Sequence, residues 1–156
     1  MKTFRRILAP TDLSPESLSA VLFASHVGKA QSAELTVLHV ATSTSMVYQE
    51  MLPPVDLSFV DDEIEKQARE HLEKWAHRNL RNYEKLKLLV RSGPASDTIC
   101  AVAGETRANL IVMATHGRIG VRHLVLGSVT EHVLRGAPCP VLTVNPELKK
   151  AVRRKR

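Results

Sequence analysis

The chain has 156 residues, of which 44% are hydrophobic, and carries a formal net charge of +6. This size and composition fit one compact domain with a buried core and do not require a second domain. No stretch approaches the roughly 20 consecutive apolar residues of a membrane span, and residues 1–6 do not resemble a signal peptide. We therefore expect a cytoplasmic protein without a membrane-embedded part.

The positive charge is concentrated at the C-terminal end. Six of the last eight residues are Lys or Arg, and removing these six leaves 16 basic against 16 acidic residues. Such a tail, without interleaved aromatic residues, is typical of a solvated, disordered end and not of a specific nucleic-acid reader. We expect residues 1–146 to form a single domain and residues 147–156 to form a disordered basic tail.

The chain contains two cysteines, Cys100 and Cys139. Both lie in apolar surroundings, without CxxC spacing and without a neighbouring histidine. We interpret them as reduced, packed thiols and not as a disulfide or a metal-binding pair.

Strand-like and helix-like segments alternate along the whole chain. In chain order we expect a strand at 5–9, a helix at 14–30, a strand at 35–40, a helix at 59–82, a strand at 86–90, a helix at 93–106, a strand at 109–114, a helix at 128–135 and a strand at 140–144. Pro10 is expected to close the first strand, and Ser14 to cap the helix that Pro15 begins. The alternation predicts an α/β domain around a mostly parallel sheet.

Two segments in the middle of the chain have less regular signals. Residues 41–58 contain Pro53 and Pro54 and form the longest irregular connection, which in a compact domain is usually functional or mobile. The helix that follows carries a single apolar stripe on which the lone Trp75 falls. We therefore interpret Trp75 as a core residue and not as a stacking platform for a ligand.

A glycine-containing loop between the strand at 109–114 and the helix at 128–135 is the segment that indicates function most directly. Glycine allows a close approach of the backbone to an anion, and the free N–H groups of a helix start favour negative charge. Residues 115–126 carry no carboxylate, and their basic side chains are His116, Arg118, Arg122 and His123. The loop therefore favours an anionic ligand.

A second interpretation of this loop involves no ligand. Ser128 and Glu131 have the spacing of a capping box, and Gly117 with Gly120 could serve an ordinary turn. Capping and anion binding use different N–H groups of one helix end, so both interpretations stay open at this stage.

The chain resembles the universal stress protein family, and in particular its ATP-binding members. The resemblance is spread over nearly the whole chain up to about residue 145. The segments that carry it are Ile7-Leu-Ala-Pro-Thr-Asp-Leu-Ser14, Leu38-His-Val40, Ala108-Asn-Leu-Ile-Val-Met-Ala-Thr-His-Gly-Arg118, Leu124-Val-Leu-Gly-Ser-Val129 and Ala137-Pro-Cys-Pro-Val-Leu-Thr-Val144.

The resemblance implies a three-layer α/β fold with helices on both faces of a five-stranded, parallel, open sheet in the order 3-2-1-4-5. In that order the chain reverses direction between strands 1 and 4, where a crevice opens that ligands of such sheets favour. The same resemblance implies that Asp12 and Val40 flank an adenine. From the residues alone, Asp12 could equally be a turn or cap residue, and Val40 reads more simply as part of a core strand.

The resemblance also implies which residues contact the rest of the nucleotide. Pro10, Thr11 and Met113 would line the base and ribose, and the phosphates would lie against Gly117, Gly127, Ser128 and Val129. His116 belongs to the same loop, and Arg118 is added as a phosphate contact from its charge alone. Ala114 stands where the family pattern has its first glycine, which adds a methyl group close to the sugar. We expect ATP, with or without Mg²⁺, to bind despite this methyl group.

The sequence argues against an enzyme. The glycine loop offers no carboxylate as a base, the chain lacks the G-x-x-x-x-G-K-[ST] phosphate loop, and its histidines form no metal-binding pair. We therefore expect no catalytic residue, no metal site, and a stress-response regulator that binds an adenine nucleotide with little or no hydrolysis. The alternatives are a nucleotide-free signalling module on the same fold and a slow ATPase. A homodimer through the last strand, Val141–Val144, is expected because an apolar sheet edge invites pairing.

Overall fold

A computed structural model describes residues 3–41, 58–115 and 126–146 of the chain. Its elements follow one another as β1 (Arg6–Thr11), α1 (Pro15–Gln31), β2 (Glu34–Ala41), α3 (Ser58–Asn79), β3 (Leu86–Ser92), α4 (Ala95–Glu105), β4 (Leu110–Ala114), α5 (Ser128–Gly136) and β5 (Val141–Val144). The long connection at 42–57, most of the glycine loop and the basic tail lie outside the described residues.

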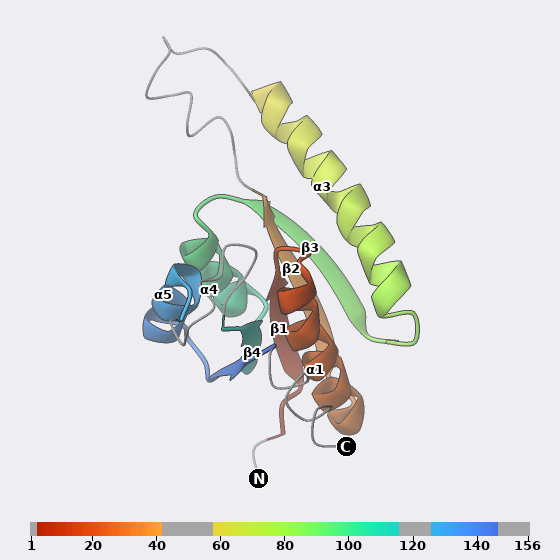
Figure 1. The fold of residues 1–156 in the computed structure, drawn as a ribbon, viewed down its shortest axis with the longest axis vertical. Coiled ribbons are helices and arrows are strands. Elements are labelled where there is room, and N and C mark those ends of the chain that lie inside the picture. Colours follow the sequence, from red (N-terminus) through yellow and green to blue (C-terminus); the bar gives the residue numbers. More distant parts are fainter. Residues whose placement is uncertain (1–2, 42–57, 116–125, 147–156) are drawn as a thin grey trace.

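The five strands form one parallel sheet in the order β3-β2-β1-β4-β5, as expected. Helices α1 and α3 cover one face of this sheet, and α4 and α5 cover the other (Figure 1). Because the chain leaves β1 toward β2 and later returns to place β4 on the other side of β1, the carboxyl ends of β1 and β4 flank the point where the strand order reverses.

Each helical layer has its own apolar core. Val21 and Ala24 of α1 and Trp75 of α3 are buried against the first face, and Trp75 is only 7% exposed. Ile99 of α4 and Val133 of α5 are buried against the second. The interpretation of Trp75 as a core residue is confirmed.

The start of α1 agrees with the sequence-based expectation. Ser14 has extended backbone angles and its hydroxyl accepts a hydrogen bond from the Ser17 N–H at 3.2 Å. Pro15 follows in the first turn, where its missing N–H has no partner to lose. The cap and proline together define where α1 begins.

The expected end of the first strand was wrong. β1 continues through Pro10 to Thr11, and both residues keep their register with β2, opposite Leu38 and His39. Proline can continue a strand where no ladder bond needs its N–H, and the register between β1 and β4 already ends at Leu8. As a result, Thr11 and the residue after it lie at the carboxyl edge of the sheet.

Helix α3 also ends earlier than expected, at Asn79 and not at about residue 82. A turn follows, in which the Tyr83 N–H donates to the Leu80 carbonyl at 3.1 Å. The remaining boundaries differ from the expected ones by one or two residues, which is within the usual uncertainty of element ends. No described helix is both long and apolar enough to cross a membrane.

Candidate ligand-binding site

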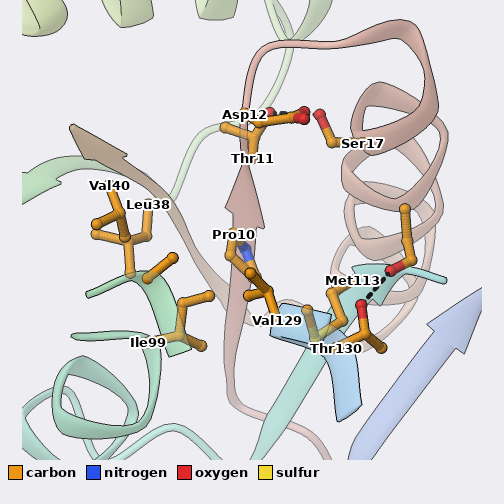
Figure 2. A pocket seen from close by; sticks show the side chains of 12 residues that line it. Pro10, Thr11, Asp12, Ser17, Leu38, Val40, Ile99, Met113, Val129 and Thr130 are labelled. Atoms are coloured by element: carbon orange, nitrogen blue, oxygen red, sulfur yellow. Dashed lines mark hydrogen bonds between the residues drawn. The ribbon is translucent and has the colours of Figure 1, made fainter. Parts of the chain in front are cut away.

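A pocket of about 180 Å³ opens at the carboxyl ends of β1, β2 and β4 (Figure 2). Its walls come from those strand ends and from the first turns of α1, α4 and α5. The structure brings seven of the residues named for the ligand together here, namely Pro10, Thr11, Asp12, Val40, Met113, Ala114 and Val129. These residues come from four separate parts of the chain, so only the fold unites them.

One wall of the pocket is apolar. Leu38 and Val40 point into it from β2, and Ile99 faces them from α4 (Figure 2). Val40 is half-buried at this wall, so it is both a strand residue packed on the core and a part of the pocket surface. A wall of this kind suits a flat, weakly polar group.

The opposite wall is polar and is built at the β1–α1 junction. Asp12 accepts hydrogen bonds from the Ser14 N–H at 3.0 Å and from the Ser14 hydroxyl at 2.5 Å. Thr11 Oγ1 accepts from the Leu13 N–H at 3.0 Å and lies 2.9 Å from the Ser17 hydroxyl. Leu13 itself adopts a left-handed conformation with φ of 63°, which costs strain that these bonds to its neighbours offset.

The turn role considered for Asp12 is therefore real. Its carboxylate orders the loop that leads into α1, as Asp often does after a strand. The same side chain lines the pocket, so the turn role and a ligand role do not exclude each other. Its ligand role stays a prediction.

The start of α5 lies directly beside the pocket. The Gly127 N–H donates to the Thr115 carbonyl at 2.9 Å, which joins the end of β4 to the start of α5. Val129 and Thr130 of the first turn reach the pocket wall, whereas Gly127 and Ser128 do not line its described part. The first-turn N–H groups of α5 thus lie next to the pocket, with the positive end of the helix dipole.

The capping box expected at this helix was wrong. Gly127 occupies the N-cap position with no side-chain hydrogen bond, and Ser128 is the first helical residue. The Glu131 carboxylate pairs instead with Arg135 at 2.7 Å, one helical turn later. The Gly127 carbonyl accepts from the Glu131 N–H at 3.0 Å, so the helix begins one residue earlier than a Ser128 cap would require and the Ser128 hydroxyl is not in the cap position.

Part of the predicted site falls outside the described residues. His116, Gly117 and Arg118 belong to this part, as do Arg122 and His123. Their roles stay predictions. The volume of the described pocket is below the 300 Å³ or so of a site that encloses a whole drug-sized ligand. The described part is therefore large enough for a base or sugar, and phosphate groups would have to extend toward α5.

Five lining residues were missed by the sequence reasoning: Ser17, Leu38, Ala95, Ile99 and Thr130. Two of them had a usable local signal, since Leu38 lies two positions before Val40 on the same strand and Thr130 lies in the first turn of α5. Ala95 and Ile99 had none, because their position depends on how α4 packs across the sheet.

The two cysteines are free and half-buried. Burial raises the pKa of both thiols, and for Cys139 the nearby Cys100 raises the pKa further. Both pack against the α4 and α5 side of the core. The interpretation of both side chains as packed in apolar surroundings is confirmed, and their reduced state stays a prediction. In the described part of the chain, no group of three or more His, Cys, Asp or Glu side chains is placed to hold a metal ion.

The fold is a doubly wound, parallel α/β architecture with a pocket at the point where the strand order reverses, and comparison with known proteins identifies its family. The model of the universal stress protein family matches residues 3–145, and the chain belongs to this family. Among similar proteins, universal stress protein MJ0531 of Methanocaldococcus jannaschii is 30% identical over 94% of this chain and 85% of its own length. Universal stress protein YxiE of Bacillus subtilis is 29% identical over 90% of this chain and 99% of its own length.

Solved structures show the same fold. Protein MJ0577 of Methanocaldococcus jannaschii superimposes with a TM-score of 0.77 at 24% identity, over 92% of this chain and 97% of its own. A universal stress protein solved in complex with cAMP superimposes with a TM-score of 0.70 at 22% identity, over 93% of this chain and 99% of its own. At this identity the likeness shows the shared fold.

Proposed function

We propose that this protein binds an adenine nucleotide in the pocket at the carboxyl ends of β1, β2 and β4 and acts as a regulator in the stress response. The observation that carries the proposal is the arrangement of the pocket. An apolar wall suited to a flat base lies within one site with a polar wall and with the start of α5, where anions bind favourably. The relative solved with cAMP supports the choice of an adenine nucleotide.

In this proposal the base lies against Val40 and Met113, the sugar lies near Asp12, and the phosphates extend toward Gly127 and Ser128. The glycine loop would supply further backbone N–H groups from Gly117 and a charge from Arg118. The preferred nucleotide is ATP, with or without Mg²⁺. A cytoplasmic location, expected from the sequence, belongs to the same proposal.

Binding is tested by titration calorimetry with MgATP. We expect a Kd near micromolar, which corresponds to a binding free energy of about −8 kcal/mol. Ala114→Gly serves as a matched variant, because it removes the methyl group that departs from the family pattern and should bind ATP at least as tightly. Gly117→Val should weaken binding. The absence of heat and of a thermal shift at millimolar MgATP would refute the proposal and favour a nucleotide-free signalling module.

Hydrolysis is tested separately. Among the side chains that line the described pocket, Asp12 is the only carboxylate, and Ser14 holds it through two hydrogen bonds. We therefore expect phosphate release at background rate. Turnover clearly above background that Gly117→Val abolishes would make the protein an ATPase.

The same proposal includes a homodimer through β5. Among the described strands β5 pairs with β4 alone, and all four of its residues are partly exposed. Leu134 on α5 is a further exposed apolar side chain, at 42% exposure. Sedimentation should give twice the 17.3 kDa mass of one chain, and a monomer at high concentration would count against the dimer.

A further inference from the structure

The polar side chains that line the described pocket are alike in how they can hydrogen-bond to a ligand, because none of them has a proton left to donate. These side chains are Thr11, Asp12, Ser17 and Thr130, and three of them are hydroxyls less than 7% exposed. A hydroxyl has one proton to donate and two lone pairs to accept with. If the protein uses that proton internally, the hydroxyl can only accept from a ligand.

The Thr11 and Ser17 protons are both used within the protein. Ser17 Oγ donates to the Ser14 carbonyl at 3.1 Å, so the proton between the two hydroxyls, which are 2.9 Å apart, belongs to Thr11. Thr11 Oγ1 also accepts from the Leu13 N–H at 3.0 Å. In the reverse assignment Ser17 would lose its bond to the Ser14 carbonyl, and no described protein group would accept the Thr11 proton.

The other two polar side chains, Thr130 and Asp12, can likewise only accept a hydrogen bond from a ligand. Thr130 Oγ1 donates its proton to the Ala114 carbonyl at 3.1 Å (Figure 2). Asp12 is a carboxylate, which only accepts, and the Ser14 hydroxyl gives its proton to it at 2.5 Å. The side-chain oxygens of the described pocket wall therefore offer lone pairs and no proton.

We infer that this wall selects ligands by their hydrogen-bond donors, and that Ser17 is a specificity-determining residue of the site. This inference rests on the proposed function. The donor is either the exocyclic amino group of the base or the 2′-hydroxyl of the sugar. A ligand that presents a carbonyl at the same place meets acceptors only, unless the Ser17 proton turns away from the Ser14 carbonyl and that bond is lost.

The inference is tested first on the unmodified protein with three nucleotides. ATP carries both donors, inosine triphosphate has a carbonyl in place of the amino group, and 2′-deoxy-ATP lacks one sugar hydroxyl. Titration calorimetry should show one of the two analogues binding about tenfold more weakly than ATP, as expected for the loss of one hydrogen bond. The weaker analogue identifies the donor that faces the wall.

Ser17→Ala then tests the residue itself. It removes one acceptor and frees the Thr11 proton, so ATP should bind about tenfold more weakly while the weaker analogue loses less or gains. Ser25→Ala is the matched control, because Ser25 is equally buried on α1 and donates to the carbonyl of Leu22 three residues earlier, but does not line the pocket. Its ligand preference should equal that of the unmodified protein.

Two sets of results would overturn the inference alone while leaving nucleotide binding intact. One is equal affinity of the unmodified protein for all three nucleotides. The other is a Ser17→Ala protein that loses the same factor for each nucleotide, or matches Ser25→Ala. Failure of all three nucleotides to bind the unmodified protein would instead overturn the proposed function, and this inference with it.

Discussion

At the residue scale, Gly28 is the position where a single methyl group matters most for the fold. Gly28 is buried on α1, and a Cβ added there would overlap the Tyr83 hydroxyl. Tyr83 is 8% exposed and its hydroxyl donates to the Ala33 carbonyl at 2.9 Å, so the ring has little room to move. Glycine at position 28 therefore allows the α3–β3 connection to pack on α1.

We expect Gly28→Ala to lower the free energy of unfolding by about 1–3 kcal/mol. Alanine gains up to about 1 kcal/mol of helix propensity, but overpacking and the loss of the Tyr83 hydrogen bond outweigh this gain. Urea unfolding measures the change. Gly104→Ala is the matched control, since nothing lies within 4 Å of a Cβ at that α4 position, and it should stabilise the protein by up to about 1 kcal/mol. Equal effects of the two substitutions would contradict the argument.

The buried phenol of Tyr83 also makes the free energy of unfolding depend on pH. Burial raises the pKa of its phenol above the usual value of about 10, so the folded state favours the neutral ring. The stabilisation is complete below pH 10 and is lost as the pH rises above it, because the unfolded chain then ionises first. Urea unfolding between pH 8 and 11 should show this decline, and Tyr83→Phe should reduce it. The two cysteines, whose pKa values are also raised, add to the decline in stability with rising pH, and they do so in the unmodified protein and in Tyr83→Phe alike. An unchanged pH profile in Tyr83→Phe would exclude this role.

At the element scale, the starts of α1 and α5 differ in how they are capped, and the difference can be measured. Ser14 caps α1 through its side chain, so Ser14→Ala should cost about 1–2 kcal/mol of unfolding free energy. Ser128 is exposed and lies inside α5, so Ser128→Ala should change stability by less than about 0.5 kcal/mol. Thermal unfolding of both variants separates the two cases. A large loss of unfolding free energy in Ser128→Ala would instead support a capping box at this helix.

These two helices also show which elements the sequence predicts well. Ser14 and Pro15 are a local signal, because the cap and the first turn involve neighbours in the chain. The start of α5 depends on the bond from Gly127 to Thr115, twelve residues earlier. The spacing of Ser128 and Glu131 contains no information about that bond, and the continuation of β1 through Pro10 likewise depends on where its neighbours pair.

At the scale of the whole molecule, the free edge of β5 is the surface through which the proposed homodimer would form. The Ile111 N–H bonds to the Pro140 carbonyl and the Thr115 N–H to the Val144 carbonyl. Since alternate residues of a parallel strand bond to opposite sides, the backbone groups of Val141 and Thr143 face the free edge.

Thr143→Pro should therefore disrupt the dimer. It removes an outward N–H without removing a bond to β4, and proline at an edge blocks further pairing. Sedimentation velocity should show a shift from dimer to monomer at micromolar concentration, with Thr143→Ala remaining dimeric. Far-ultraviolet circular dichroism checks that both variants fold. A Thr143→Pro protein that folds and stays dimeric would place the interface elsewhere.

The candidate site was predictable in part, for reasons that differ from residue to residue. Pro10 and Thr11 end β1, Asp12 follows it, and Val129 lies just after the glycine loop, so the resemblance in sequence located them. Ile99 and Ser17 join the same pocket only through the packing of α4 and α1 on the sheet.

The sequence by itself determined the alternation of strands and helices, the cap of α1 and the core position of Trp75, because each depends on local spacing and on the polarity of side chains. The tertiary structure alone decided that Gly127 occupies the N-cap of α5 without a capping box and that four polar side chains line one pocket. It also decided which hydrogen-bond partners these side chains have. Hydrogen-bond partners that are distant in the chain, such as Thr130 and the Ala114 carbonyl, meet only when the helices are packed.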